Sequence, residues 1–331
     1  MQMKMIGHDN TKTQIRRAVE SARARNVAIP HMLFAGAPGC GKTTMAKEIA
    51  KVSQANFIKA IPEDMKTYES VLSLLEQLDH SGYDRRGNRI GRIKPTIIFF
   101  DEIHAMPLKG QEKLGIAMEE WQIESNHANR YIWLPFFTLV GATTNDGKLS
   151  KPFRDRFKLR FVFQTYEEEE LTRIVQLHAG RMKMIISGRA ARDIAVRSKG
   201  TPRIAVGYLE RARDMALSLQ SKIITSSITQ RTFGEMKVDE EGLTETEIKV
   251  LKALYNAGTT VGLDNLSIIT NESSKTLAES VEPFLIQKGL LLRSGKGRLL
   301  TPVGKKYIEL MYSDDPRIVP KEEIPVGYKR V

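Results

Sequence analysis

The residue pattern with the clearest chemistry is LFAGAPGCGKTT at residues 33–44, an apolar run followed by a glycine-rich turn and a helical pattern. Glycines permit a backbone that aims successive N–H groups at one anion, at the positive end of the following helix. A lysine after this turn neutralises the β- and γ-phosphates of a nucleotide, and the next threonine offers its hydroxyl to Mg²⁺. The pattern therefore predicts a P-loop that binds ATP and Mg²⁺ through Gly36, Gly39, Gly41, Lys42, Thr43 and Thr44.

A second group of candidate residues follows the continuous apolar run at residues 96–100, which is typical of a parallel strand buried on both faces. The run ends in Asp101 and Glu102, and acidic residues at the carboxyl end of such a strand lie beside the phosphates in doubly wound sheets. We expect Asp101 to hold Mg²⁺ through water. Glu102 is then the candidate that orients and deprotonates the attacking water.

Two further polar groups follow later strands. Residues 136–142 predict a strand that ends in Thr143, Thr144 and Asn145, which either read the γ-phosphate or form a simple turn. Arg156 lies in the sequence RDRF before a last strand at 160–163. An arginine beside a transferred phosphate stabilises the charge of the transition state, whereas arginines in a turn are otherwise solvated.

Composition limits the class of protein. The 331 residues suffice for about two or three domains, and 51 Lys plus Arg against 39 Asp plus Glu leave a net charge of +12. This charge favours a polyanionic partner such as nucleic acid, although an ordinary basic surface also explains it. One cysteine, Cys40, excludes an internal disulfide framework, and we find neither a membrane-spanning run nor a secretory pattern. The sequence predicts a cytoplasmic protein without a membrane partner.

The elements around the P-loop are predicted from periodicity. A helix is expected at residues 9–25, with a capping box from Thr11 to Gln14, and another at 68–78. Residues 31–35 form the strand that leads into the P-loop. Residues 81–94 carry glycines and basic residues without apolar periodicity, which predicts a loop that either contacts DNA phosphates or is a surface excursion.

From Glu167 onward the pattern indicates helices only. Two of them are expected at residues 190–199 and 201–219, and the second opens with Thr201 and Pro202. Arg203 follows directly, so it is in a position to reach a nucleotide lying between two domains.

The carboxy-terminal pattern predicts a winged helix. Thr244 and Glu247 form a capping box, helices are expected at 263–270 and 274–288, and two strands surround a Gly-Lys-Gly turn. Winged helices bind DNA or dock on proteins. The hairpin residues Arg293, Lys296 and Arg298 favour contact with DNA phosphates.

Taken together, these motifs resemble the AAA+ family of ring ATPases, and within it the RuvB family of motors for Holliday-junction branch migration. The resemblance covers residues 6–307 and rests on seven stretches besides the P-loop. They are DEIH at 101–104, GATT at 141–144, RDRF at 154–157, GTPRIA at 200–205, VGLDNL at 261–266, EPFLIQ at 282–287 and KGR at 296–298.

The resemblance implies an α/β P-loop AAA+ domain at 1–165, an all-helical lid at 166–238, a winged-helix DNA-binding domain at 239–312 and an irregular tail at 313–331. It also implies a hexameric ring that translocates on double-stranded DNA as ATP is hydrolysed, drawing four-way junction arms through a complex with RuvA. The roles carried over are sensor 1 for Thr144, an arginine finger acting in trans for Arg156, sensor 2 for Arg203, packing near the nucleotide for Tyr166, an adenine cradle for Ile6 and Gly7, and DNA contact for Arg293 and Arg298.

Three departures from the family pattern are apparent. The chain begins close to Ile6, so an upstream arginine-containing segment is expected to be missing, and the basic loop at 81–94 looks added. The stretch between Trp121 and Phe136 is shorter, and SNHAN at 125–129 replaces the apolar hairpin tip that docks on RuvA in the family. The sequence therefore predicts a DNA motor with another partner or none. An AAA+ loader that assembles on DNA and recruits another enzyme is the alternative, and a winged-helix regulator with a vestigial nucleotide site is a third.

Overall fold

The computed structural model describes residues 3–78, 94–124, 131–312 and 315, and the statements below refer to these. They form two compact units, which we describe separately. The first contains Met1–His178 and Gly200–Gly207, and the second contains Ala179–Lys199 and Tyr208–Val331.

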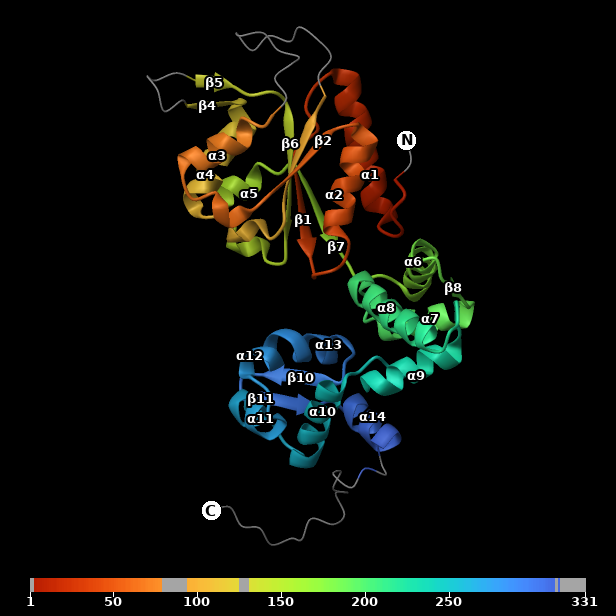
Figure 1. Cartoon of the computed structure of the whole chain (residues 1–331). Coiled ribbons are helices and arrows are strands. Elements are labelled where there is room, and N and C mark those ends of the chain that lie inside the picture. The colour runs from red at the N-terminus through yellow and green to blue at the C-terminus, as the bar shows by residue number, and fades with distance from the viewer. Residues whose placement is uncertain (1–2, 79–93, 125–130, 313–314, 316–331) are drawn as a thin grey trace. The chain divides into compact units, whose positions relative to one another are not determined.

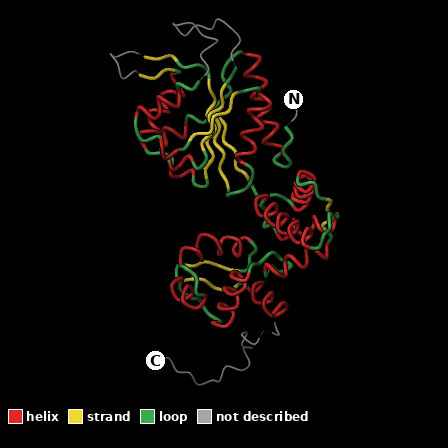
Figure 2. The backbone as a smooth tube through the Cα atoms, in the orientation of Figure 1, coloured by secondary structure: helices red, strands yellow, loops and turns green. Residues whose placement is uncertain are grey.

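A parallel sheet forms the centre of the first unit (Figure 2). Its five strands pair in the order β2-β3-β6-β1-β7, and each neighbouring pair is parallel. The predicted strands at 31–35 and 96–100 are confirmed to within a residue. The second strand escaped prediction, because it is only half-buried and lacks a continuous apolar run. The bounds are Met32–Gly36 for β1, Asn56–Ala60 for β2, Thr96–Phe100 for β3, Phe137–Thr143 for β6 and Leu159–Phe163 for β7.

Helices cover both faces of this sheet (Figure 1). One face carries α1 (Asp9–Arg25) and α2 (Lys42–Ser53), and the other carries α3 (Tyr68–Leu75), α4 (Leu108–Glu120) and α5 (Lys151–Asp155). On the second face, the strand residues pack into one apolar cluster with residues of all three helices, among them Leu75, Leu114 and Phe153. This three-layer arrangement confirms the predicted α/β P-loop fold.

The predicted capping box of the first helix is wrong. Helix α1 begins at Asp9, and its N-cap, His8, has a left-handed backbone with φ of 52°. Thr11 therefore lies inside the first turn. The exposed Asp9 carboxylate accepts from Lys12 at 2.6 Å at the positive end of the helix instead.

Short elements complete the first unit. Three 3₁₀ turns lie at Pro62–Asp64 (η1), Ile103–Ala105 (η2) and Asp146–Lys148 (η3). Strands β4 (Gln122–Glu124) and β5 (Tyr131–Trp133) pair antiparallel. The polar stretch predicted at 125–129 lies outside the described residues. So does the basic loop at 81–94, apart from Lys94.

Helices α6 (Glu168–Arg181) and α8 (Pro202–Ser218) belong partly to each unit, and α7 (Gly188–Arg197) and α9 (Ser226–Met236) lie in the second unit. The expectation of helices only is wrong in one respect. Strands β8 (Ile185–Ile186) and β9 (Ile223–Ile224) form a parallel pair. Two-residue strands are too short to give a periodic signal.

The rest of the second unit is the predicted winged helix, with one apolar core. The capping box from Thr244 to Glu247 is confirmed. The expected helix at 274–288 is one helical run of three types, and its π-helical middle immediately precedes the segment that contains Pro283, a residue that lacks an N–H donor. The elements are α10 (Glu245–Ala257), α11 (Leu263–Thr270), α12 (Ser274–Thr276), η4 (Leu277–Val281), α13 (Glu282–Gln287), β10 (Leu291–Ser294), β11 (Gly297–Leu300) and α14 (Pro302–Tyr312).

Within the described residues, no helix combines the length and apolar character needed to cross a bilayer. Of the predicted tail at 313–331, only Asp315 is described.

A buried histidine makes the stability of the first unit dependent on pH. His31 precedes β1 and is 6% exposed; its Nδ1 accepts from the Leu139 N–H at 2.9 Å, so its Nε2 donates to the Met118 carbonyl at 3.1 Å. Burial lowers the pKa of His31 to about 4. The unfolded chain therefore binds a proton between pH 6.5 and 4 that the folded chain does not, and stability falls as the pH decreases through this window.

We expect this group to lower the free energy of unfolding by about 2 kcal/mol between pH 7.5 and pH 5. Urea denaturation followed by tryptophan fluorescence measures it, because the Trp121 ring stacks on His31 with centroids 5.9 Å apart. The variant His31→Gln should lose most of the pH dependence, whereas His178→Gln on α6 should keep it. Equal pH dependence in wild type and His31→Gln would contradict the assignment.

Candidate active site

The P-loop connects β1 to α2, and the latter begins at Lys42. Gly41 has φ of 92°, and Gly39 has φ of 80°, a left-handed conformation that other residues rarely adopt. The Lys42 ammonium donates to the carbonyl oxygens of Gly36 and Ala37 at 2.7 and 2.9 Å. These bonds hold the ammonium across the loop, beside the amino terminus of α2.

Burial and nearby carboxylates act in opposite directions on the pKa of the Lys42 ammonium. Burial lowers the pKa of Lys42, and the carboxylates of Glu102 and Asp101 act in the opposite direction. Cys40 is fully buried, and burial raises the pKa of its thiol. Its side chain is therefore a packing group of the loop and not a nucleophile at neutral pH.

Strand register brings the other predicted residues to the P-loop. Phe100 of β3 pairs with Gly141 of β6, and Thr143 of β6 pairs with Ala35 of β1. The three strands therefore end at one edge of the sheet, and the residues that follow them meet there. The Thr43 hydroxyl lies 3.5 Å from Asp101 Oδ2.

Glu102 is held in place by the residues that follow β6. Its φ is 49°, a left-handed backbone that is uncommon for glutamate. Its Oε2 accepts from both the N–H and the hydroxyl of Thr144 at 3.0 Å. Thr144 therefore touches the predicted catalytic carboxylate directly.

His104 is a site residue to which sequence reasoning gave no role. Its Nδ1 lies 3.1 Å from Glu102 Oε2 and 2.9 Å from the Thr143 hydroxyl. The imidazole thus bridges the two strand ends. The DEIH spacing was the available signal, because a 3₁₀ turn after Glu102 brings the side chain two residues later back to it.

Residues 5–8 form a short segment, which we call the hook, that packs against the P-loop. A Cβ on Gly7 would lie 2.6 Å from the Tyr166 ring, and the His8 ring packs edge-on against Tyr166 at 4.8 Å. His8 Nε2 lies 3.3 Å from the Cys40 carbonyl, and burial lowers the pKa of His8. Gly7 of the predicted cradle is therefore next to Tyr166, and His8 is an addition from the structure.

Arg203 also lies against the P-loop. A Cβ on Gly39 would come within 2.8 Å of Arg203 Cβ and 2.9 Å of the Thr201 methyl group. The Gly200 carbonyl accepts from the Tyr166 N–H at 2.8 Å. This hydrogen bond fixes the segment that carries Arg203 to Tyr166, which packs on the hook.

Arg156 does not lie beside the residues described so far. Its guanidinium lies over Gly115 of α4, donates to the Pro152 carbonyl at 2.8 Å and pairs with Glu119 at 2.9 Å. The Arg156 side chain is 26% exposed. The contacts of Arg156 that we describe are to α4 and α5 and not to the P-loop, so the structure does not bring it to the group formed by Lys42 and Glu102.

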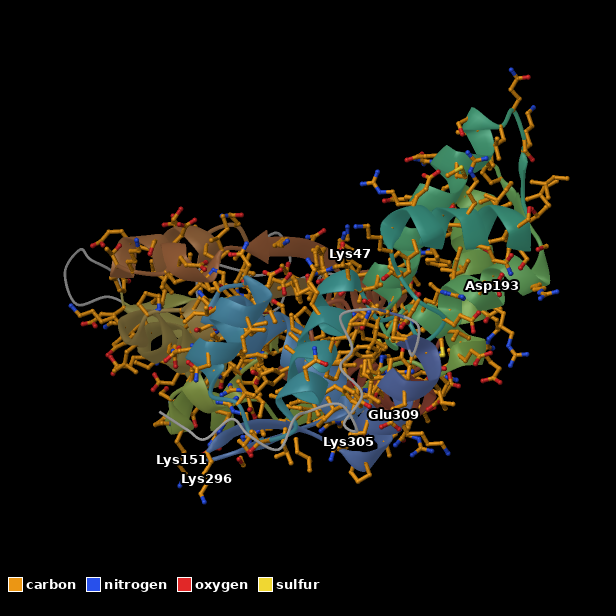
Figure 3. All side chains as sticks on the ribbon, turned by 90° about the horizontal axis from the view of Figure 1, so that it is seen from below. Lys47, Lys151, Asp193, Lys296, Lys305 and Glu309 are labelled. Carbon is orange, nitrogen blue, oxygen red and sulfur yellow. The ribbon has the colours of Figure 1, made fainter. Side chains whose placement is uncertain are left out.

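The three predicted DNA contacts of the winged helix also separate into two classes. Arg293 on β10 and Lys296 in the turn are exposed, and the Lys296 side chain extends from the end of the hairpin (Figure 3). Arg298 is 6% exposed, and its guanidinium binds the buried Glu282 carboxylate at 2.6 and 3.2 Å. This corrects the expectation for Arg298, because a buried carboxylate requires a cation and occupies the guanidinium that DNA would need.

The donor set fits Mg²⁺. A hydroxyl and a carboxylate, Thr43 and Asp101, are hard oxygen ligands of the kind that bind Mg²⁺ together with nucleotide phosphates and water. Among the described residues, no group of three or more His, Cys, Asp or Glu forms an all-protein metal cage. The arrangement therefore suits a metal that arrives with a nucleotide.

Family models match three consecutive parts of the chain. Residues 1–163 match the family described as the Holliday junction DNA helicase RuvB P-loop domain, residues 166–239 match the RuvB AAA lid domain, and residues 240–309 match the RuvB C-terminal winged helix domain.

Solved structures agree with these matches. The Thermotoga maritima RuvB Holliday junction branch migration motor is 34% identical, covers 92% of this chain and 95% of its own, and superposes with a TM-score of 0.75. A single-substitution variant of the same protein is also 34% identical over 92% of this chain and 96% of its own, with a TM-score of 0.76. Three consecutive domain matches and this identity show that the chain, with its nucleotide-binding P-loop, belongs to the RuvB family of AAA+ ATPases.

Proposed function

We propose that this protein is an ATP-hydrolysing ring motor that translocates on double-stranded DNA and drives branch migration of four-way junctions. The proposal rests on the observation that the candidate catalytic residues lie in two separate places. One edge of the sheet brings together Lys42, Asp101 and Glu102, whereas Arg156 packs against α4 and is partly exposed. A catalytic arginine outside its own site is available to a neighbouring subunit.

Within one subunit, the residues divide the work on the triphosphate. Lys42 balances the charge of the phosphates, while Thr43 and Asp101 hold Mg²⁺, which neutralises phosphate charge when bound. Glu102 accepts a proton from the attacking water. Thr144, which donates two hydrogen bonds to Glu102, orients this carboxylate and senses the γ-phosphate.

The hook and the Arg203 segment complete the nucleotide site. We propose that Ile6 and Gly7 hold the adenine, and that Tyr166 packs beside it, because Tyr166 touches both the hook and the P-loop. Arg203 contacts the phosphates from beside Gly39. Its movement on hydrolysis would move the lid at 166–238.

Assembly follows from the position of Arg156. The arginine finger has to leave Glu119 and reach the γ-phosphate of the next subunit, which requires a head-to-tail contact repeated around a closed ring. We propose a hexamer, as the family resemblance implies. A RuvA-like partner is doubtful, because SNHAN replaces the apolar tip at 125–129.

The winged helix at 239–312 is the proposed DNA-binding domain. Arg293 and Lys296 present two exposed cations on one hairpin, and the chain carries a net charge of +12. Contacts to phosphates position a protein on a duplex without reading its sequence, which suits a translocating motor.

A junction assay tests the proposal directly. The purified chain with Mg²⁺ and ATP is expected to convert a labelled four-way junction into two duplexes, and a nonhydrolysable ATP analogue should prevent this. DNA binding with ATP turnover but without conversion would favour the loader function instead.

Glu102→Gln should bind ATP with unchanged affinity and lower its hydrolysis by at least about 100-fold, because an amide cannot accept the proton. Fluorescent nucleotide titration and a phosphate-release assay measure the two quantities. Substitution of the exposed Glu120 by Gln is the matched control and should change neither. Turnover within a few-fold of wild type in Glu102→Gln would remove Glu102 from its role.

Arg156→Ala should keep nucleotide affinity and lower ATP hydrolysis by at least about 100-fold, because an arginine finger supplies transition-state stabilisation. The loss should persist at protein concentrations where the ring is assembled, as monitored by sedimentation. Arg160→Ala, at an exposed position nearby, is the control. Full activity of assembled Arg156→Ala would contradict the assignment.

The double variant Arg293→Ala/Lys296→Ala should weaken DNA binding and reduce the slope of log affinity against log salt by about 2, one for each lost phosphate contact. Arg298→Met should instead destabilise the winged helix by about 3 kcal/mol or more, because it leaves Glu282 buried without its cation. Salt titrations of DNA affinity and thermal melting separate the two effects. An unchanged salt slope in the double variant would exclude this hairpin as the DNA contact.

A further inference from the structure

A buried ion pair joins the segment before Arg203 to the winged helix. The Lys199 ammonium donates to both Glu247 carboxylate oxygens at 2.6 Å. The two side chains are 14% and 3% exposed. Lys199 lies in the part of the chain that matches the lid family, and Glu247 in the part that matches the winged-helix family.

The pair is fixed firmly at its winged-helix end. Glu247 Oε2 also accepts from the N–H and the hydroxyl of Thr244 at 2.8 and 2.9 Å, which forms the capping box of α10. The Lys199 ammonium lies 4.4 Å from the centroid of the Phe284 ring on α13. One cation therefore contacts two helices of the winged-helix domain.

Gly200 and the residues that follow it pack against residues of the proposed nucleotide site. Gly200 has φ of 67°, and a Cβ there would lie 2.6 Å from Thr165. Its carbonyl accepts from the Tyr166 N–H, and three residues later the chain reaches Arg203, against Gly39 of the P-loop. Only three residues thus lie between Lys199, which is paired with the winged helix, and Arg203, which lies against the P-loop.

We propose that Lys199 and Glu247 form a positioning pair that couples ATP hydrolysis to movement of the winged helix on DNA. The inference rests on the proposed motor function. When the Arg203 segment shifts with the nucleotide, Lys199 has to move with it, because the connecting chain is too short to absorb the change. The pair is buried, and its acceptor Glu247 is also bound by Thr244. The pair therefore transmits the shift to the winged helix without exchanging partners with water.

The chain contains a matched control. Lys237 pairs with Glu245 at 2.9 Å and links the same two parts of the chain, but its side chains are 66% and 45% exposed. Exposed pairs are hydrated and contribute little to a fixed geometry. Removal of Lys237 is therefore expected to leave coupling unchanged.

The test compares Lys199→Met, Glu247→Gln, the double variant Lys199→Met/Glu247→Gln and Lys237→Met, each in the full-length protein. Two rates are measured with the same labelled four-way junction at saturating ATP: phosphate release and junction conversion. Each Lys199 or Glu247 variant should keep phosphate release within about twofold, while junctions converted per ATP hydrolysed fall at least about tenfold. Lys237→Met should keep the wild-type ratio.

Two further measurements separate coupling from folding. The double variant removes both charges and leaves no buried unpaired ion, so its melting temperature should approach that of wild type while its coupling stays low. Lys199→Arg retains the cation and should recover most of the ratio.

A wild-type ratio in the folded double variant would overturn the inference, and so would an equal loss in Lys237→Met. If the wild-type protein hydrolyses ATP but converts no junctions, the proposed motor function fails instead, and the two outcomes are distinct.

Discussion

Parallel hydrogen bonding among β1, β3 and β6 is the constraint on which the rest of this structure depends. The register pairs Phe100 with Gly141 and Thr143 with Ala35, so three chain segments that are far apart in sequence end at one edge of the sheet. Lys42, Asp101 and Glu102 all depend on that edge for their positions. The glycine-rich turn, the acidic pair and Thr144 are each attached to a strand end, and a slip of register would separate the Glu102 carboxylate from its two donors on Thr144.

Buried charge has a different use in the winged helix. The guanidinium of Arg298 binds Glu282 within this domain, and the ammonium of Lys199 in the lid binds Glu247 of this domain, with all four side chains largely removed from water. Such pairs contribute little net stability, but they tolerate no other geometry, because a displaced partner would leave a buried charge uncompensated. By contrast, Glu102 after β3 and Arg156 against α4 each keep an exposed part, so their side chains can change partners.

Much of this could be predicted from the sequence, because the informative residues carry strong local constraints. The P-loop needs its glycines and lysine in one short stretch, and a buried parallel strand needs a continuous apolar run, so the sequence alone singles out Lys42 and Asp101 as candidates. The Arg298 pair could not be predicted, since the side of a hairpin that a cation faces depends on where Glu282 packs. The same holds for Lys199, 48 residues from its acceptor. The α1 cap failed for a local reason, because a left-handed His8 starts the helix before Thr11.

The central claim is that ATP is cleaved at a seam between two copies of this chain, with Glu102 from one copy and Arg156 from the next. An equimolar mixture of Glu102→Gln and Arg156→Ala subunits, each inactive alone, tests it most directly by phosphate release. Random mixing places an intact Glu102 opposite an intact Arg156 at about a quarter of the seams, so the mixture should recover a substantial part of wild-type turnover. A mixture that assembles into rings and stays inactive would contradict the account.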